Sequence, residues 1–101
     1  MTYSHPQQGS AEEALKLRRK LGEILKGRRL ELEMNQKDLA DAVGFGYYTM
    51  VSQIESGRTR IPPERMMDYA KTLTMSPKEF GTMVLRHYDP FTFKMIFGKQ
   101  K

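Results

Sequence analysis

Apolar side chains recur at helical spacing along most of the chain, and no segment alternates between apolar and polar residues as a half-buried strand does. The sequence therefore predicts an all-α fold. A first helix is predicted to begin at Ser10, which has the capping-box spacing with Glu13. It carries Leu21 and Leu25 on its apolar face and is expected to end near Glu33.

Capping residues and prolines divide the rest of the chain into shorter helices. Asn35 is expected to cap a second helix, and a third helix is predicted over residues 47–56. Pro62 marks the start of a fourth helix, and Ser76, which precedes another proline, caps a fifth. Asp89 is expected to cap a short sixth helix. The pattern as a whole predicts five or six helices joined by short turns.

The third predicted helix has two faces of different chemistry. One face is apolar and is expected to pack on the core: Tyr47, Met50, Val51 and Ile54. The other is polar and uncharged: Tyr48, Thr49, Ser52, Gln53 and Ser56. A helix fits the major groove of DNA, where a Gln can pair with adenine and a Thr methyl can meet a thymine methyl. We expect this face to contact bases, with Gln53 as the main reader; the alternative is a surface helix that is simply solvated.

Short sequence elements on both sides of this helix form a recognisable set: Leu21-Gly22, Asn35-Gln36, Leu39-Ala40, Val43-Gly44, residues 51–57, residues 70–73 and Met75-Ser76. Together they resemble the phage Cro and repressor type helix-turn-helix proteins, also called the XRE family, over residues 21–80. The resemblance implies a five-helix domain that binds operator DNA as a homodimer with its third helix in the major groove. The turn formed by residues 44–48 is one residue longer than is usual in the family.

Residues that hold the DNA backbone follow from the same comparison: Asn35, Gln36, Tyr47, Arg58 and Arg60. Gln36 opens the second helix, where free backbone N–H groups favour a phosphate. Arg58 and Arg60 lie in the loop that family members place along the sugar-phosphate backbone. Arg29 and Glu55 match a pair that the family buries between its first and third helices, so their expected role is structural.

The C-terminal segment is apolar on all sides and lies outside the resemblance: Phe91, Phe93, Met95, Ile96 and Phe97. Only Thr92 and Lys94 interrupt it. Such a helix must be covered, because a surface helix normally shows a single apolar stripe. The apolar helix could pack on the core of the same domain, on a second copy of the chain, or on a different protein.

Composition supports a small binding module. The chain has 101 residues and a net charge of +5, which favours an anionic partner. It has no cysteine, and His5 and His87 are its only histidines. We therefore expect no metal site, no cofactor and no enzymatic activity. No apolar run approaches membrane-spanning length, and residues 1–10 lack the core of a signal peptide, so the expected location is cytoplasmic and nucleoid-associated.

Three regions are expected: a flexible N-terminal tail over residues 1–10, the helix-turn-helix domain over 11–88, and the apolar segment with a basic tail over 89–101. The function that fits best is a sequence-specific transcriptional regulator that binds double-stranded operator or promoter DNA as a homodimer. The alternative is a transcription co-activator or antitoxin-like adaptor. In that case the C-terminal segment would bind RNA polymerase, a sigma-like factor or a toxin.

Overall fold

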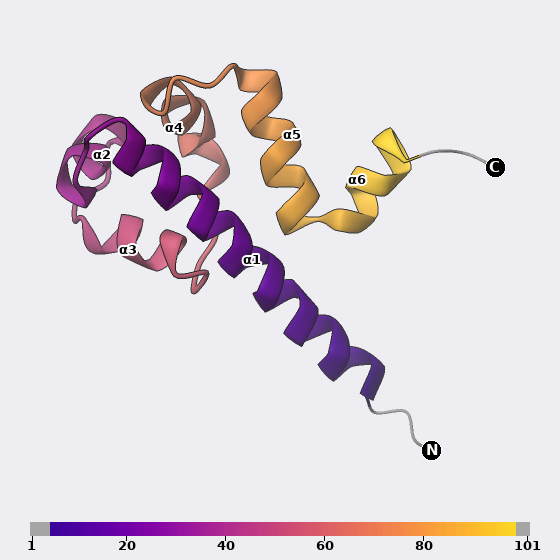
Figure 1. The fold of residues 1–101 in the computed structure, drawn as a ribbon. Helices are drawn as coiled ribbons and strands as arrows, with labels where there is room; N and C mark the ends of the chain where they lie inside the picture. Colours follow the sequence, from indigo (N-terminus) through magenta and orange to yellow (C-terminus); the bar gives the residue numbers. More distant parts are fainter. Residues whose placement is uncertain (1–4, 99–101) are drawn as a thin grey trace.

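The computed structural model describes residues 5–98, and within that range the protein is all-helical (Figure 1). Six α-helices and one short 3-10 helix are present: α1 (His5–Glu31), α2 (Gln36–Val43), α3 (Thr49–Glu55), η1 (Pro63–Arg65), α4 (Met66–Thr72), α5 (Pro77–Tyr88) and α6 (Pro90–Phe97). The all-α prediction is confirmed. The sequence also predicted a helical extension before the five-helix domain and a short apolar helix after it, and the structure contains both: the extension forms one helix with α1, and α6 follows α5. With α6 the described chain has six α-helices, so the five-helix description is not exact.

The first helix begins earlier than the sequence suggested. Ser10 lies inside α1, which starts at His5, so the helix takes in residues 5–10 of the expected tail. Pro6 gives a physical reason, since proline is favoured in the first turn of a helix, where its missing N–H costs nothing. Residues 1–4 of that tail lie outside the described part of the chain.

The core lies between α1 and the four helices that follow it. Its largest fully buried side chains come from all five helices and from Leu73, the residue that follows α4: Tyr69, Phe80, Leu21, Leu25, Leu39, Ile54, Leu73, Val43 and Val51. Tyr69 is central, because its ring stacks on Phe80 with centroids 5.9 Å apart and meets the edge of Phe45 at 6.4 Å. Offset and edge-to-face rings of this kind add specific packing to the burial of apolar area.

Helix α6 stands apart from this core at the end of α5 (Figure 1). Asp89 caps it as predicted, accepting hydrogen bonds from the Thr92 backbone N–H at 3.1 Å and from the Thr92 hydroxyl at 2.7 Å. These hydrogen bonds lower the pKa of Asp89. The Arg86 guanidinium of α5 lies 4.7 Å from the centroid of the Phe93 ring. None of the α6 residues is fully buried: Phe93 is half-buried, and the other large apolar side chains of the helix are exposed.

Candidate nucleic-acid interface

The second and third helices form the helix-turn-helix. Asn35 and Asp38 make a reciprocal capping box at the start of α2, with the Asn35 side chain accepting from the Asp38 backbone N–H at 2.7 Å. Gly44 ends α2 in the left-handed region with φ of 84°. A side chain is unfavourable in that conformation, so glycine is the residue that allows the sharp turn here. Residues 45–48 then lead into α3.

The inner face of α3 is buried. Val51 and Ile54 have almost no exposed surface, and Met50 packs against the same core. The expectation that Tyr47 shares this face is wrong, because its side chain is 79% exposed. Helix α3 begins only at Thr49, so the helical spacing that relates Tyr47 to Met50 in the sequence does not hold in space.

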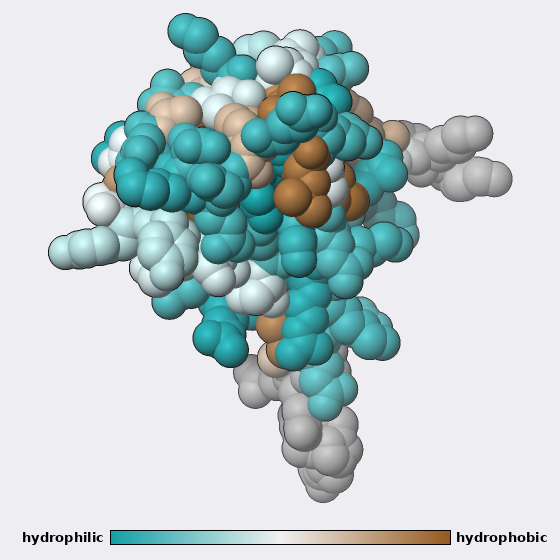
Figure 2. Space-filling model, turned by 60° about the vertical axis from the view of Figure 1, so that its left-hand side comes forward, coloured by the Kyte–Doolittle hydropathy of each residue, from teal (hydrophilic) through white to brown (hydrophobic). Residues whose placement is uncertain are grey.

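The outer face of α3 is polar and open to solvent. Thr49, Gln53 and Ser56 are exposed, Ser52 is half-buried, and Tyr48 is exposed at the N-cap position. Figure 2 turns the side on which α2 and α3 lie in Figure 1 toward the viewer, and hydrophilic and neutral side chains cover most of it. The structure thus brings all five candidate base readers to one accessible end or face of a short helix.

A buried ion pair fixes α3 in this position. Arg29 of α1 and Glu55 of α3 form a two-point contact, Nε to Oε2 at 2.7 Å and Nη2 to Oε1 at 3.0 Å, and both residues are buried. The hydrogen bond with Glu55 raises the pKa of Arg29 above its ordinary value. Arg29 also donates to the Met34 carbonyl at 2.8 Å, and Gln36 donates to Glu55 at 3.1 Å. The network joins α1, α2 and α3 into one rigid unit.

A shallow hollow lies at the N-terminus of α2, next to the start of α3, and is lined by Arg29, Asn35, Gln36, Lys37 and Tyr48. The free N–H groups of a helix start and the positive end of its dipole favour an anion there. Lys37, which the sequence reading passed over, adds a positive charge at this place. It pairs with Asp41 at 2.9 Å on the surface, and this contact raises its pKa. The sequence could have indicated this role, because Lys37 lies in the first turn of the predicted second helix.

The two arginines of the loop after α3 lie in different surroundings. Arg58 is exposed, and its side chain is in none of the ion pairs found within the described part of the chain. Arg60 lies over the Tyr88 ring, 5.4 Å from its centroid, and donates to the Tyr88 carbonyl at 3.3 Å. The structure therefore places Arg58 beside the end of α3 and ties Arg60 to the end of α5.

A basic cluster on α1, formed by Lys16, Arg18, Arg19 and Lys20, borders the same loop. Arg18 donates from Nε to the Gly57 carbonyl at 3.0 Å. Arg18 stands one helical turn before Gly22, on the face of α1 that crosses α3, and this spacing could have identified it. Positive charge at this end of α3 also complements the helix dipole.

This fold and site define a helix-turn-helix DNA-binding protein. The family profile described as "Helix-turn-helix" matches residues 25–80, more than half of the chain. The chain belongs to this family, the Cro and repressor (XRE) type of DNA-binding regulators. Comparison with curated proteins found no significant match, and neither did comparison with solved structures. None of the helices described could cross a membrane. Residues 5–98 also contain no group of side chains suited to a metal ion.

Proposed function

We propose that the protein is a sequence-specific transcriptional regulator that binds operator DNA as a homodimer, with α3 of each subunit in the major groove. The observation that supports this most directly is the split character of α3. Its inner side is locked to the core through Ile54 and the buried Glu55, and its outer side offers only uncharged donors and acceptors. A rigid helix of this kind can read base edges without a large rearrangement.

Within this proposal, side chains divide into base readers and backbone contacts. Gln53 is the principal base reader, and the other readers are Tyr48, Thr49, Ser52 and Ser56. The hollow at the start of α2, with Asn35 and Gln36, takes a phosphate, and the exposed Tyr47 and Arg58 take others. Phosphate contacts set the register of the protein on the duplex and carry no sequence information themselves.

The short length of α3 supports binding as a dimer. It has seven residues, which at about 1.5 Å per residue is roughly 10 Å, the length of about three base pairs. One such helix cannot select a site in a genome. Two subunits related by a twofold axis read two half-sites, whose centres lie about one helical turn apart. The expected operator is therefore a near-palindrome.

Selection of bound duplexes from a random DNA pool tests this function. We expect a near-palindromic consensus with two short half-sites. On that consensus, Gln53→Ala is expected to weaken binding by about 1–3 kcal/mol, while binding to a scrambled duplex changes little. Fluorescence anisotropy titrations of the wild type and of Gln53→Ala, each on the consensus and on the scrambled duplex, measure this difference.

Two results would contradict the proposal. An equal loss on consensus and scrambled duplexes would remove Gln53 from base recognition. Failure of the selection to enrich any sequence would remove operator binding altogether. Circular dichroism of the variant is the folding control, and a normal spectrum is expected because the Gln53 side chain is exposed.

A further inference from the structure

The N-terminal half of α1 contains a segment that is basic and has no acidic residue. Residues 14–22 include Lys16, Arg18, Arg19 and Lys20 but neither Asp nor Glu. From residue 23 onward the helix carries charges of both signs. The family profile begins only at residue 25, so the match to the family does not account for these basic side chains.

Three of these residues form one exposed face, the basic face of α1. Lys16, Arg19 and Lys20 are exposed and have the spacing i, i+3 and i+4, which places them on one side of a helix. None of the three is in an ion pair found among the described residues. Like charges at this spacing repel one another and destabilise a helix. The arrangement is therefore unfavourable in the subunit alone, and an anionic partner would relieve it.

Contacts at Gly57 place this face beside the loop that follows α3. Arg18 donates from Nε to the Gly57 carbonyl at 3.0 Å. A Cβ built on Gly57 would lie 2.8 Å from the Arg19 backbone nitrogen, so the loop and the helix pack closely at this point. Arg58, which takes a phosphate in the proposed complex, is the next residue of the loop. Arg19 therefore lies next to a proposed phosphate contact.

Beyond this contact, α1 runs past the end of α3 and away from the rest of the domain (Figure 1). Lys16 lies three residues before Arg19, which is about 4.5 Å farther along the helix axis. Helix α3 covers only about three base pairs, so a bound duplex continues past both of its ends. The basic face of α1 lies beyond one of those ends, the C-terminal one.

We infer that the basic face of α1 binds the sugar-phosphate backbone of DNA beside Arg58, outside the base pairs that α3 reads. This inference rests on the DNA binding of the proposed function and adds a contact surface to it. The outer face of α3 is uncharged, so neighbouring elements must neutralise the phosphates. A duplex held by α3 and Arg58 is the anionic partner that lies next to this face. Such contacts give affinity and register without sequence preference.

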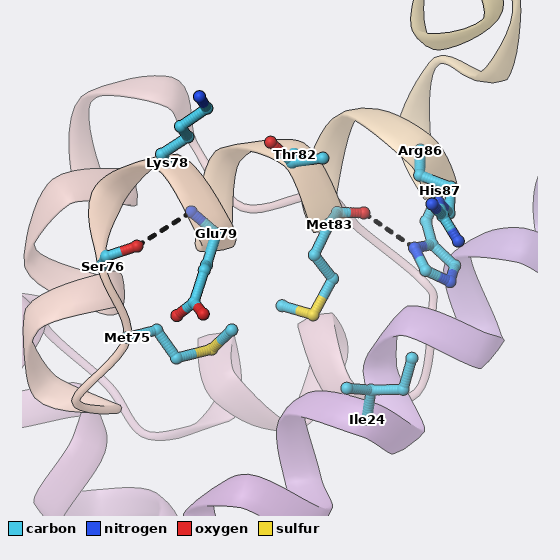
Figure 3. Close-up of a pocket in the computed structure, with 9 residues that line it drawn as sticks. All are labelled: Ile24, Met75, Ser76, Lys78, Glu79, Thr82, Met83, Arg86 and His87. Atoms are coloured by element: carbon cyan, nitrogen blue, oxygen red, sulfur yellow. Dashed lines mark hydrogen bonds between the residues drawn. The ribbon is translucent and has the colours of Figure 1, made fainter. Parts of the chain in front are cut away.

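Two triple variants that remove the same charge test this contact in the full chain. The first removes the basic face: Lys16→Gln, Arg19→Gln and Lys20→Gln. The second is the control and removes exposed lysines of α4, α5 and α6: Lys71→Gln, Lys78→Gln and Lys94→Gln. Lys78 points away from the groove between α1 and α5 (Figure 3), and α1 stands between α5 and α3 (Figure 1). Each variant lowers the net charge by three, from +5 to +2.

The dependence of DNA affinity on salt separates the two variants. Without the basic face, this dependence should fall by about 2–3 counterions on consensus and scrambled duplexes alike. Between about 50 and 200 mM salt, the first variant should thus lose roughly 10- to 40-fold less affinity than the wild type. The control should behave as the wild type. An unchanged salt dependence in the first variant overturns the inference, and so does an equal decrease in the control.

Urea unfolding shows whether the basic face has a structural role instead. Gln has a helix propensity similar to that of Lys and Arg, and the substitutions remove like-charge repulsion. The first variant is therefore expected to be at least as stable as the wild type while its DNA binding weakens. Lower stability together with unchanged DNA binding would assign the basic face to the fold and overturn the inference.

Directed cleavage of the DNA backbone tests where α1 lies, because the chain has no cysteine of its own. Lys16→Cys protein that carries an iron–EDTA reagent is expected to cut the consensus duplex beside, and outside, the base pairs that Gln53 reads. Lys78→Cys protein with the same reagent is the control and is expected not to cut it. Cutting by neither protein, or equally by both, would place α1 away from the DNA and overturn the inference.

The two proposals can fail separately. A lower salt dependence in the first variant, in a protein whose wild type shows no sequence preference, would keep the α1 contact and remove operator binding. Sequence preference that depends on Gln53, with a salt dependence that the basic face does not change, would keep operator binding and remove the α1 contact.

Discussion

At the scale of single residues, the environment of Tyr69 stands out. Its side chain is fully buried beside Phe80, and its hydroxyl has no hydrogen-bond partner among the described residues. Burial is the main cause that raises the pKa of Tyr69, and the nearby Glu55 carboxylate adds to it. A buried hydroxyl without a partner lowers the stability of the fold. The ring therefore stabilises this core, and the hydroxyl does not.

Tyr69→Phe is expected to increase the free energy of unfolding by about 1 kcal/mol, because it removes the cost of the unpartnered hydroxyl. Tyr88→Phe is the matched control, since the Tyr88 hydroxyl accepts a hydrogen bond from the Ile61 N–H at 3.1 Å. That variant is expected to be destabilised. Urea unfolding of both at neutral pH gives the comparison, and a destabilised Tyr69→Phe would show that the hydroxyl is satisfied in solution.

The same two tyrosines predict sensitivity to alkaline pH. Burial raises the pKa of Tyr69 and of Tyr88, so the folded state keeps both protons where the unfolded chain loses them. Their contribution to stability is present below about pH 10, the pKa of an unperturbed tyrosine, and is lost as pH rises toward the higher folded-state values. Unfolding measured from pH 8 to 11 should show this decline, with a shallower slope in Tyr69→Phe. An unchanged slope in that variant would exclude Tyr69 as a source.

At the scale of the elements, α1 is the support on which α3 rests. The two helices cross where Gly22 meets the backbone of Glu55, and a Cβ built on Gly22 would lie 2.1 Å from the Glu55 carbonyl oxygen. Gly27, one turn further along the same helix, has no atom within 4 Å of such a Cβ. Both glycines weaken a helix in isolation, but only Gly22 is required by packing.

Substitution of each glycine by alanine is expected to change stability in opposite directions. Gly22→Ala forces α1 and α3 apart and should destabilise the fold by about 1–3 kcal/mol, as overpacking does. Gly27→Ala should stabilise it by up to about 1 kcal/mol through helix propensity. Thermal unfolding at one fixed protein concentration measures both. Equal shifts in the two variants would show that the α1–α3 contact is looser than the structure indicates.

Most helices could be predicted from residues close together in the sequence. Contacts between residues far apart in the sequence could not. The caps at Asn35, Ser76 and Asp89 are confirmed, because capping depends only on residues a few positions apart. Tyr47 was assigned to the wrong face because its environment depends on where the turn ends. The contact between Arg60 and Tyr88 joins residues 28 positions apart and has no local signature.

At the scale of the whole molecule, the charge of +5 is spread over several elements. The outer face of α3 is uncharged, so attraction to DNA must come from its surroundings. Arg58 lies just after α3. Arg18 of α1 donates a hydrogen bond to the carbonyl of Gly57, the residue before Arg58. In the proposed complex, these surroundings supply the salt-dependent part of the affinity, whereas α3 supplies the sequence preference.

The two loop arginines allow a direct test of this division, because they are the same residue type two positions apart. Arg58→Ala should weaken binding to consensus and scrambled duplexes alike and reduce the dependence of affinity on salt by about one counterion. Arg60→Ala should leave the salt dependence nearly unchanged and lower stability instead, because its guanidinium is held by Tyr88. Anisotropy titrations at several salt concentrations, with urea unfolding of both variants, separate the two effects. If Arg60→Ala reduced the salt dependence as much as Arg58→Ala, Arg60 would have to leave Tyr88 for a phosphate when DNA binds. If Arg58→Ala changed the preferred sequence, Arg58 would belong with the base readers of α3.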